Sequence, residues 1–199
     1  CGTISTTSLG TLQEENDLPM VGVVEPACRR ALAVSEKKRV GVIATLASIR
    51  SGAYETVLRR LDPEVEVFRQ SCPLFVPLVE NGRFRPGDIV IETVAREYLE
   101  PLRETGIDTL ILGCTHYPLL VDIIAEILGP KVTLVSAGEE SAYELKRLLK
   151  SGGLWAGPAG QGGTEFYVSD RPEDFERIAS VFLQEDLRHT ARRIDIDQY

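Results

Sequence analysis

The hydrophobic positions of this chain fall into short runs that alternate with longer amphipathic stretches. The runs are rich in β-branched residues and nearly free of polar positions, which is typical of strands buried on both faces of a parallel sheet. The predicted strands are Met20–Val24, Arg39–Ala44, Val65–Arg69, Thr109–Leu112, Lys131–Val135 and Phe166–Ser169. The stretches between them repeat apolar residues at helical spacing. The predicted helices are Pro26–Val34, Ser51–Leu61, Asp88–Leu102, Tyr117–Leu128, Ser141–Lys150 and Arg171–Gln184.

This alternation predicts an α/β fold whose mainly parallel sheets are flanked by helices. We expect two lobes: residues 24–135 form one continuously, and residues 1–23 together with 136–199 form the other. The reason is that the last strand and the last helix need a sheet partner outside the middle lobe. Gly152–Gly163 is predicted to be a flexible loop, because six of its twelve positions are glycine. The charged tail Arg188–Tyr199 is predicted to fray.

The composition narrows the functional classes. The 199 residues include 22 Lys and Arg and 30 Asp and Glu, so the formal net charge is −8. Nucleic acids and anionic membranes need a basic field, so neither is expected as the main partner. No apolar run approaches the ~20 residues of a membrane span. The four cysteines form no CxxC pair, which indicates reduced thiols in the cytoplasm. Since the single Met is Met20, we expect a processed chain or a piece of a longer one.

Cys114 is the strongest candidate for chemistry. It follows the apolar run Thr109–Leu112 and Gly113, and it precedes a predicted helix. Ligands of parallel α/β sheets bind at the carboxyl ends of strands. The positive N-terminal end of a helix also favours a thiolate. We therefore predict a functional thiol here, whereas Cys28, on a predicted apolar helix face, is interpreted as a core residue.

The residues after Cys1 form a second candidate. Gly2, Thr3 and the hydroxyl-bearing residues that follow can surround a carboxylate with hydroxyls and backbone N–H groups. They can equally begin a helix that runs to Leu12 with Thr3 or Ser5 as its N-cap, and the two interpretations are compatible. Cys1-Gly2-Thr3 faintly resembles Cys114-Thr115-His116, because each tripeptide places a cysteine and a threonine in a predicted strand-to-helix loop.

Glu80 and His116 are the other titratable candidates. Glu80 ends an apolar run predicted to be strand-like, Cys72–Glu80, and is either a surface acid or an orienter of a catalytic group. His116 is either a proton relay or a metal ligand. Cys114 and His116 alone are too few ligands for zinc, so no metal site is predicted.

Five segments of the chain closely resemble the glutamate racemase family. They are VGVVEPA (21–27), VIATLASIRSGAY (42–54), CPLFVPLVENG (72–82), DTLILGCTHYPLL (108–120) and FYVSDRPEDF (166–175). The resemblance covers the whole chain and weakens beyond residue 183. It implies two pseudo-symmetric α/β lobes and an isomerase that interconverts L- and D-glutamate without a cofactor, supplying D-glutamate for peptidoglycan. We also expect a cytoplasmic homodimer.

In that family, two cysteines stand on opposite faces of the substrate α-carbon. One thiolate removes the α-proton and the other thiol delivers a proton from behind, which suits a racemase because mirror-image substrates need equivalent acid–base groups. The resemblance maps these cysteines to Cys1 and Cys114, and maps the acid and imidazole that support the second cysteine to Glu80 and His116. The substrate-binding positions it implies are Gly2, Thr3, Thr45, Thr115 and His116.

The chain departs from the family pattern in two ways. The family's N-terminal strand and helix, with an Asp-Ser-Gly loop whose Asp assists the first cysteine, have no counterpart before Cys1. We therefore expect a lobe that is incomplete at its N-terminus, and a chain that alone is weak or inactive. Gly2 stands where Asn is commoner, and Ser136-Ala137-Gly138 stands where the family has an Asp-Ser-Gly-like turn.

Three alternatives remain open. Cys1 can be the N-terminal nucleophile of a glutamine amidotransferase, although those folds are rich in antiparallel strands. The chain can be an inactive fragment or a binding module of the same fold. It can also be a sister racemase that acts on aspartate or a hydantoin, although CTHYPLL and CPLFVPLVE favour glutamate.

Overall fold

The computed structural model describes residues 1–156 and 163–198. The chain forms two compact units, Cys1–Trp155 and Ala156–Tyr199. The first holds a four-stranded sheet and the second a two-stranded sheet, and every strand pair is parallel. The predicted α/β class is therefore confirmed. The division into residues 24–135 and 1–23 with 136–199 stays a prediction.

The larger sheet has the strand order β2-β1-β3-β4, with β1 and β3 at its centre. Val42 on β1 lies opposite Arg69 on β2 and Ile111 on β3, and Ile111 lies opposite Val135 on β4. All four residues of β3 are buried, as expected for a central parallel strand. The strands are β1 (Arg39–Ala44), β2 (Glu66–Ser71), β3 (Thr109–Leu112) and β4 (Thr133–Ser136).

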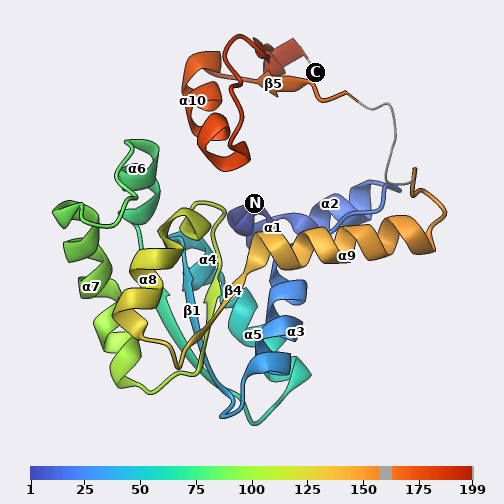
Figure 1. Cartoon of the computed structure of the whole chain (residues 1–199). Coiled ribbons are helices and arrows are strands. Elements are labelled where there is room, and N and C mark those ends of the chain that lie inside the picture. Colours follow the sequence, from blue (N-terminus) through green and yellow to red (C-terminus); the bar gives the residue numbers. More distant parts are fainter. Residues whose placement is uncertain (157–162, 199) are drawn as a thin grey trace. The chain divides into compact units, whose positions relative to one another are not determined.

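Helices cover both faces of this sheet. In Figure 1, α7 and α8 lie on one side of the strands, and α3 and α5 lie on the other. The helices of this unit are α1 (Gly2–Thr7), α2 (Leu9–Glu15), α3 (Val24–Val34), α4 (Leu46–Ser51), α5 (Ala53–Leu61), α6 (Phe75–Glu80), α7 (Ile89–Glu104), α8 (Val121–Leu128) and α9 (Ala137–Ser151), with the 3-10 helix η1 (Tyr117–Leu120) before α8.

The core consists of two apolar clusters, one for each face of the sheet. Ile43, Leu110 and Leu112 pack with buried residues of α6, α7 and α8. Val42 and Ile111 face the other way and pack with buried residues of α3 and α5. This alternation follows from the two-residue period of a strand. Within residues 1–156 and 163–198, no helix is long and apolar enough to cross a membrane.

The second unit pairs β5 (Phe166–Val168) with β6 (Ala191–Arg193) and packs α10 (Pro172–Leu183) on β6. A short 3-10 helix, η2 (Ile196–Gln198), follows β6. The prediction that the tail frays is wrong for residues 191–193. The buried Glu176 carboxylate accepts a hydrogen bond from the Ala191 N–H at 2.9 Å and so ties the tail to α10. Residues 157–162 of the predicted glycine-rich loop lie outside the described residues.

Two predicted strands are wrong. Met20–Val23 is not a strand, and Val24 already begins α3, because this apolar run lines a cavity instead of pairing with a neighbouring strand. The run Cys72–Glu80 contains α6 (Phe75–Glu80) rather than a strand. Phe75 and Val79 are buried one helical turn apart, so their spacing matches a helix with one apolar side.

Two predicted helices begin or divide differently. Gly52, at φ +67°, separates α4 from α5, so the helix predicted from Ser51 begins at Ala53. The helix predicted to run to Leu12 divides at Ser8 into α1 and α2. Cys1, rather than Thr3 or Ser5, is the N-cap of α1. The Thr3 hydroxyl contacts another loop instead, as described next.

Candidate active site

The loops that follow β1 and β3 meet at the carboxyl edge of the sheet. The connection from β1 to β2 runs through α4 and α5 on one face, and the connection from β3 to β4 runs through η1 and α8 on the other. Adjacent strands whose connections leave in opposite directions open a crevice between their ends, which is where ligands of such sheets bind. Thr45 follows β1 here, and Cys114 follows β3 after Gly113.

Two glycines bring the Cys1 segment against the Cys114 segment. A Cβ atom on Gly2 would lie 2.5 Å from the Gly113 carbonyl oxygen. A Cβ atom on Gly113 would lie 2.8 Å from the Ile43 carbonyl oxygen. Neither position therefore tolerates a side chain without moving backbone. The close approach of Gly2 to Gly113 places the residues next to both cysteines in contact.

A cluster of hydroxyls joins the first segment to the loop after β1. Thr3 Oγ1 and Thr45 Oγ1 share a hydrogen bond of 3.1 Å. The Thr45 hydroxyl donates to Ser48 Oγ at 3.2 Å and, as the N-cap of α4, accepts from the Ser48 N–H at 3.4 Å. Thr6 Oγ1 lies 3.5 Å from Ser48 Oγ. The predicted residues Thr3 and Thr45 thus lie together, and α1 and α4 are joined by hydroxyl groups.

Ser48 is the residue of this cluster that the sequence prediction missed. Its side chain is buried, and its hydroxyl contacts Thr6 and the predicted substrate-binding residue Thr45. The signal for it was the spacing, because an N-cap residue such as Thr45 contacts the residue three positions later.

Cys114, His116 and Glu80 form a linear arrangement. The Cys114 sulfur lies 3.8 Å from His116 Nδ1, and His116 Nε2 lies 3.1 Å from Glu80 Oε1. The Thr115 hydroxyl also lies 3.4 Å from His116 Nδ1. Glu80 is the last residue of α6, and the other three precede η1, so the arrangement joins two connections on the same face of the sheet. A carboxylate that holds one imidazole nitrogen orients the ring and leaves the other nitrogen toward the thiol.

Burial dominates the electrostatics of the buried thiols. Burial raises the pKa of Cys114, and the His116 backbone N–H and the Thr115 hydroxyl offset part of that rise. Burial also raises the pKa of Cys72, and the charge of Cys114 adds to it. Burial raises the pKa of Cys28 to about 12, and Cys28 lies in the core as predicted.

The other features singled out in the sequence are the exposure of the two cysteines, the turn at Ser136 and the question of a metal site. Cys1 is exposed and Cys114 is half-buried. Ser136 ends β4 at the same edge of the sheet, where its hydroxyl caps α9 by accepting from the Glu139 N–H at 3.3 Å. In the part of the chain that the structure describes, no three His, Cys, Asp or Glu side chains are grouped to hold a metal ion.

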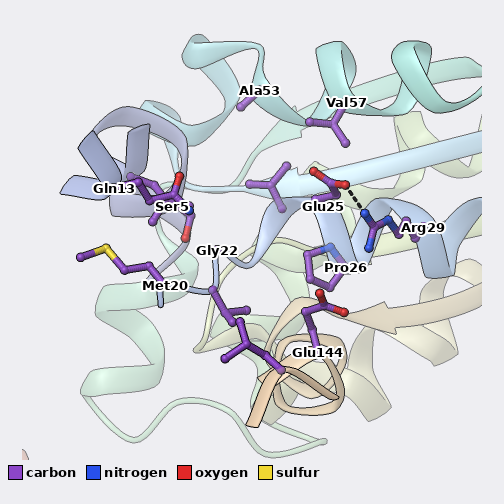
Figure 2. A pocket seen from close by; sticks show the side chains of 14 residues that line it. Ser5, Gln13, Met20, Gly22, Glu25, Pro26, Arg29, Ala53, Val57 and Glu144 are labelled. Atoms are coloured by element: carbon purple, nitrogen blue, oxygen red, sulfur yellow. Dashed lines mark hydrogen bonds and ion pairs between the residues drawn. The ribbon is translucent and has the colours of Figure 1, made fainter. Parts of the chain in front are cut away.

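A separate cavity of about 390 Å³ is lined by residues of α1, α2, α3, α5 and α9 and of the segment that precedes α3. Figure 2 shows Ser5 and Gln13 on one side of it, and Glu25 and Arg29, which form an ion pair, on another. Its lining contains none of the predicted site residues. The cavity therefore does not compete with the cysteine segments as the candidate active site.

Comparisons with known proteins identify the family of this chain. Residues 1–143 match the Asp/Glu/Hydantoin racemase family. A glutamate racemase from Geobacter metallireducens is 47% identical over 183 residues, which are 92% of this chain and 67% of that protein. One from Corynebacterium kroppenstedtii is 48% identical over 149 residues, 75% of this chain and 51% of that protein. This chain thus spans about half to two thirds of the length of these relatives.

Solved structures give the same result. A glutamate racemase from Bacillus anthracis superimposes with a TM-score of 0.90 at 36% identity, covering 98% of this chain and 72% of that one. A glutamate racemase from Francisella tularensis, solved in complex with D-glutamate, superimposes with a TM-score of 0.88 at 34% identity, covering 100% of this chain and 73% of that one. The chain therefore belongs to the aspartate/glutamate/hydantoin racemase family, and within it to the glutamate racemases.

Proposed function

We propose that this chain carries the reaction centre of an enzyme that interconverts L- and D-glutamate by proton transfer between two cysteines, Cys1 and Cys114. The observation that carries the proposal is the contact of Gly2 with Gly113, which puts the exposed Cys1 segment beside the Cys114–His116–Glu80 arrangement. Two thiols suit a racemase, since each can act as acid in one direction and as base in the other. The relative solved with D-glutamate supports the choice of substrate.

Cys114 enters the cycle as the acid. Because burial raises the pKa of this thiol above its usual value, it holds its proton at neutral pH. It can then deliver that proton to one face of the substrate α-carbon while Cys1 takes the α-proton from the other. The thiolate left on Cys114 is stabilised by the backbone N–H of His116 and by the Thr115 hydroxyl. Glu80 orients the His116 ring. The reverse reaction exchanges the two roles.

The substrate carboxylate is held by neutral donors. Gly2, Thr3, Thr45, Thr115 and His116 are the proposed contacts, and Ser48 joins them through its hydrogen bond with Thr45. Hydroxyl and backbone N–H donors stabilise the negative charge that spreads from the α-carbon into the carboxylate in the transition state. These groups need no cofactor, and we propose that the reaction uses none.

The wider role follows the family. We propose that the D-glutamate formed supplies peptidoglycan synthesis, that the enzyme works in the cytoplasm, and that it acts as a homodimer. The chain alone is proposed to be much less active than a form that carries the segment preceding Cys1 in its relatives, because that segment supplies an Asp beside the first cysteine.

Racemisation in deuterated water tests this proposal. The chain, produced with the coding sequence upstream of Cys1, is given L- or D-glutamate without added metal or pyridoxal phosphate. We expect deuterium at the α-carbon of the product. Cys1→Ser and Cys114→Ser should each lower the rate by about 10³-fold or more in both directions, since a serine hydroxyl is a far weaker acid than a thiol.

Cys28→Ala is the matched control, because it removes a buried thiol away from the reacting pair, and its rate should be close to that of the wild type. Full activity in Cys114→Ser would exclude the two-cysteine mechanism. Faster turnover of aspartate or a hydantoin than of glutamate would replace the proposed substrate.

A further inference from the structure

The hydroxyl of Tyr54 is buried directly beneath the Cys114 loop. Tyr54 is the second residue of α5 and is 2% exposed. Its oxygen lies 3.0 Å from the position that a Cβ atom on Gly113 would occupy. Within residues 1–156 and 163–198, this hydroxyl finds no hydrogen-bond partner. A buried polar group without a partner is destabilising, so its presence beside a proposed reaction centre needs an explanation.

A water molecule does not supply the missing partner from the void that Tyr54 lines. This void lies between α4, α5 and the sheet, and it is too small to admit a water-sized sphere. The aromatic ring also packs in the apolar cluster that holds Val42, Leu58 and Ile111, which leaves the hydroxyl at the sheet edge. Cys114 follows Gly113 directly, and its charge changes in the proposed reaction.

Tyr117 provides an internal comparison. It is also fully buried, and it lies on the other face of the sheet, packed against Phe75. Its hydroxyl is already satisfied, because it donates to the Cys72 carbonyl oxygen at 3.2 Å. Burial, and to a lesser degree the charge of Cys114, raise the pKa of both tyrosines. Two buried hydroxyls thus lie within the field of the same thiolate, and one of them is unpaired.

We propose that Tyr54 is a positioning residue for Cys114: the Tyr54 hydroxyl turns to donate a hydrogen bond to the Cys114 sulfur when that sulfur is a thiolate. The inference rests on the proposed function, in which Cys114 alternates between thiol and thiolate. A Cβ atom on Gly113 would crowd the Tyr54 hydroxyl at 3.0 Å, in addition to meeting the Ile43 carbonyl oxygen. The inference explains the unpaired state of the Tyr54 hydroxyl, since the partner exists only after the proton has left.

The titration of Cys114 provides the measurement, and other groups contribute to it. They are Tyr54 on α5, Cys72 after β2, His116 and Tyr117 beside Cys114, and Glu80 on α6, which contacts the His116 ring. Comparing two tyrosine variants leaves every other group in place.

The experiment measures the rate at which iodoacetamide alkylates Cys114 in the 199-residue chain, followed from pH 6 to 11 by mass spectrometry of the Cys114 peptide. In Tyr54→Phe we expect the midpoint of the profile to move up by about one pH unit, which is roughly tenfold slower alkylation below the midpoint, because the thiolate loses a donor. The melting temperature should stay the same or rise. In Tyr117→Phe we expect a lower melting temperature and an unchanged midpoint.

An unchanged midpoint in Tyr54→Phe overturns the inference, because Tyr54 would then be a packing residue. An equal shift in both variants also overturns it, because the unpaired hydroxyl would then have no special role. A shift confined to Tyr54→Phe supports it. If that shift occurs but no form of the protein racemises glutamate, the proposed function fails while the link between Tyr54 and Cys114 stands.

Discussion

The segments that carry Cys1 and Cys114 have similar tripeptides but are held by different parts of the fold. Cys114 follows β3, whose four residues are buried, and η1 and α8 continue from it into the core. Cys1 precedes the six-residue helix α1, in which Gly2 is the buried residue, and the residues of the next helix, α2, are all at least partly exposed. Cys114 thus lies between buried elements of the core, whereas Cys1 lies in a segment that packs against the core through few buried residues.

This difference teaches how two matching groups can be positioned by unequal means. The Cys114 side is held more firmly, since its loop is anchored at both ends by buried elements. The Cys1 side depends on the Gly2–Gly113 contact and on hydroxyl hydrogen bonds, so it can detach at a small cost in free energy. Conditions that unfold the sheet and changes that release α1 should therefore have separable effects.

The largest expected effect is a loss of stability at alkaline pH. It should unfold the sheet, and with it the loop that carries Cys114. The folded pKa of Cys28 is about 12 against an ordinary value of 9.0, so its contribution is complete below pH 9 and is lost as the pH rises from 9 to 12. The loss is about 1.4 kcal/mol for each pH unit, or roughly 3 kcal/mol by pH 11. Urea unfolding from pH 8 to pH 11 measures it.

Cys28→Ala should reduce the slope of the free energy of unfolding against pH by the contribution of one thiol. The other buried thiols and tyrosines should account for the slope that remains. An identical slope in the variant would show that Cys28 is not a buried thiol in solution. Exchange of the α1 amides, corrected for the intrinsic pH effect, should depend much less on pH than unfolding of the sheet does.

The next effect compares the two glycines in contact. Gly113→Ala places a methyl group against the Ile43 carbonyl, the Ala44 side chain and the Tyr54 hydroxyl, so we expect unfolding to become easier by about 2 kcal/mol. Gly2→Ala should instead release α1, with rapid amide exchange in residues 2–7 and a nearly unchanged free energy of unfolding. Gly10→Ala is the control, since a methyl group there meets nothing within 4 Å.

Equal losses of global stability in Gly2→Ala and Gly113→Ala would contradict the comparison, because α1 would then belong to the cooperative core. Protection of α1 that survives in Gly2→Ala would show that the hydroxyl cluster alone holds the Cys1 segment.

The smallest effect concerns that hydroxyl cluster. Thr45→Val removes the N-cap of α4 and the link to Thr3, so we expect a loss of about 1 kcal/mol in the free energy of unfolding. Thr45→Ser keeps the hydroxyl and should retain most of that stability. Chemical denaturation of both variants, with amide exchange of α1, distinguishes the cap from the link. A Thr45→Val variant that is as stable as the wild type and keeps α1 protected would show that the hydroxyl cluster does not hold the Cys1 segment.

Part of the fold was predictable because it depends on local pattern. Arg39–Ala44 and Thr109–Leu112 are strands within the predicted bounds, since continuous β-branched runs suit a buried parallel strand. Met20–Val24 has the same local pattern and yet is not a strand. Whether such a run pairs depends on a neighbouring strand, which is a property of the tertiary structure. The run Cys72–Glu80 failed for a different reason, since its helical spacing was hidden among residues that are nearly all apolar.

The chemical types at the site came from the sequence, and their arrangement came from the tertiary structure. Cys114 and His116 could be singled out because they follow a predicted strand end, whereas Thr45 and Thr115 were predicted from the resemblance to a known family. Glu80 and His116 are 36 positions apart in the sequence, which gives no sign that their side chains lie 3.1 Å apart. The contact of Gly2 with Gly113 and the unpaired Tyr54 hydroxyl likewise arise only when the crossover connections bring distant strand ends together, because hydrogen bonding and close packing act through space and not along the chain.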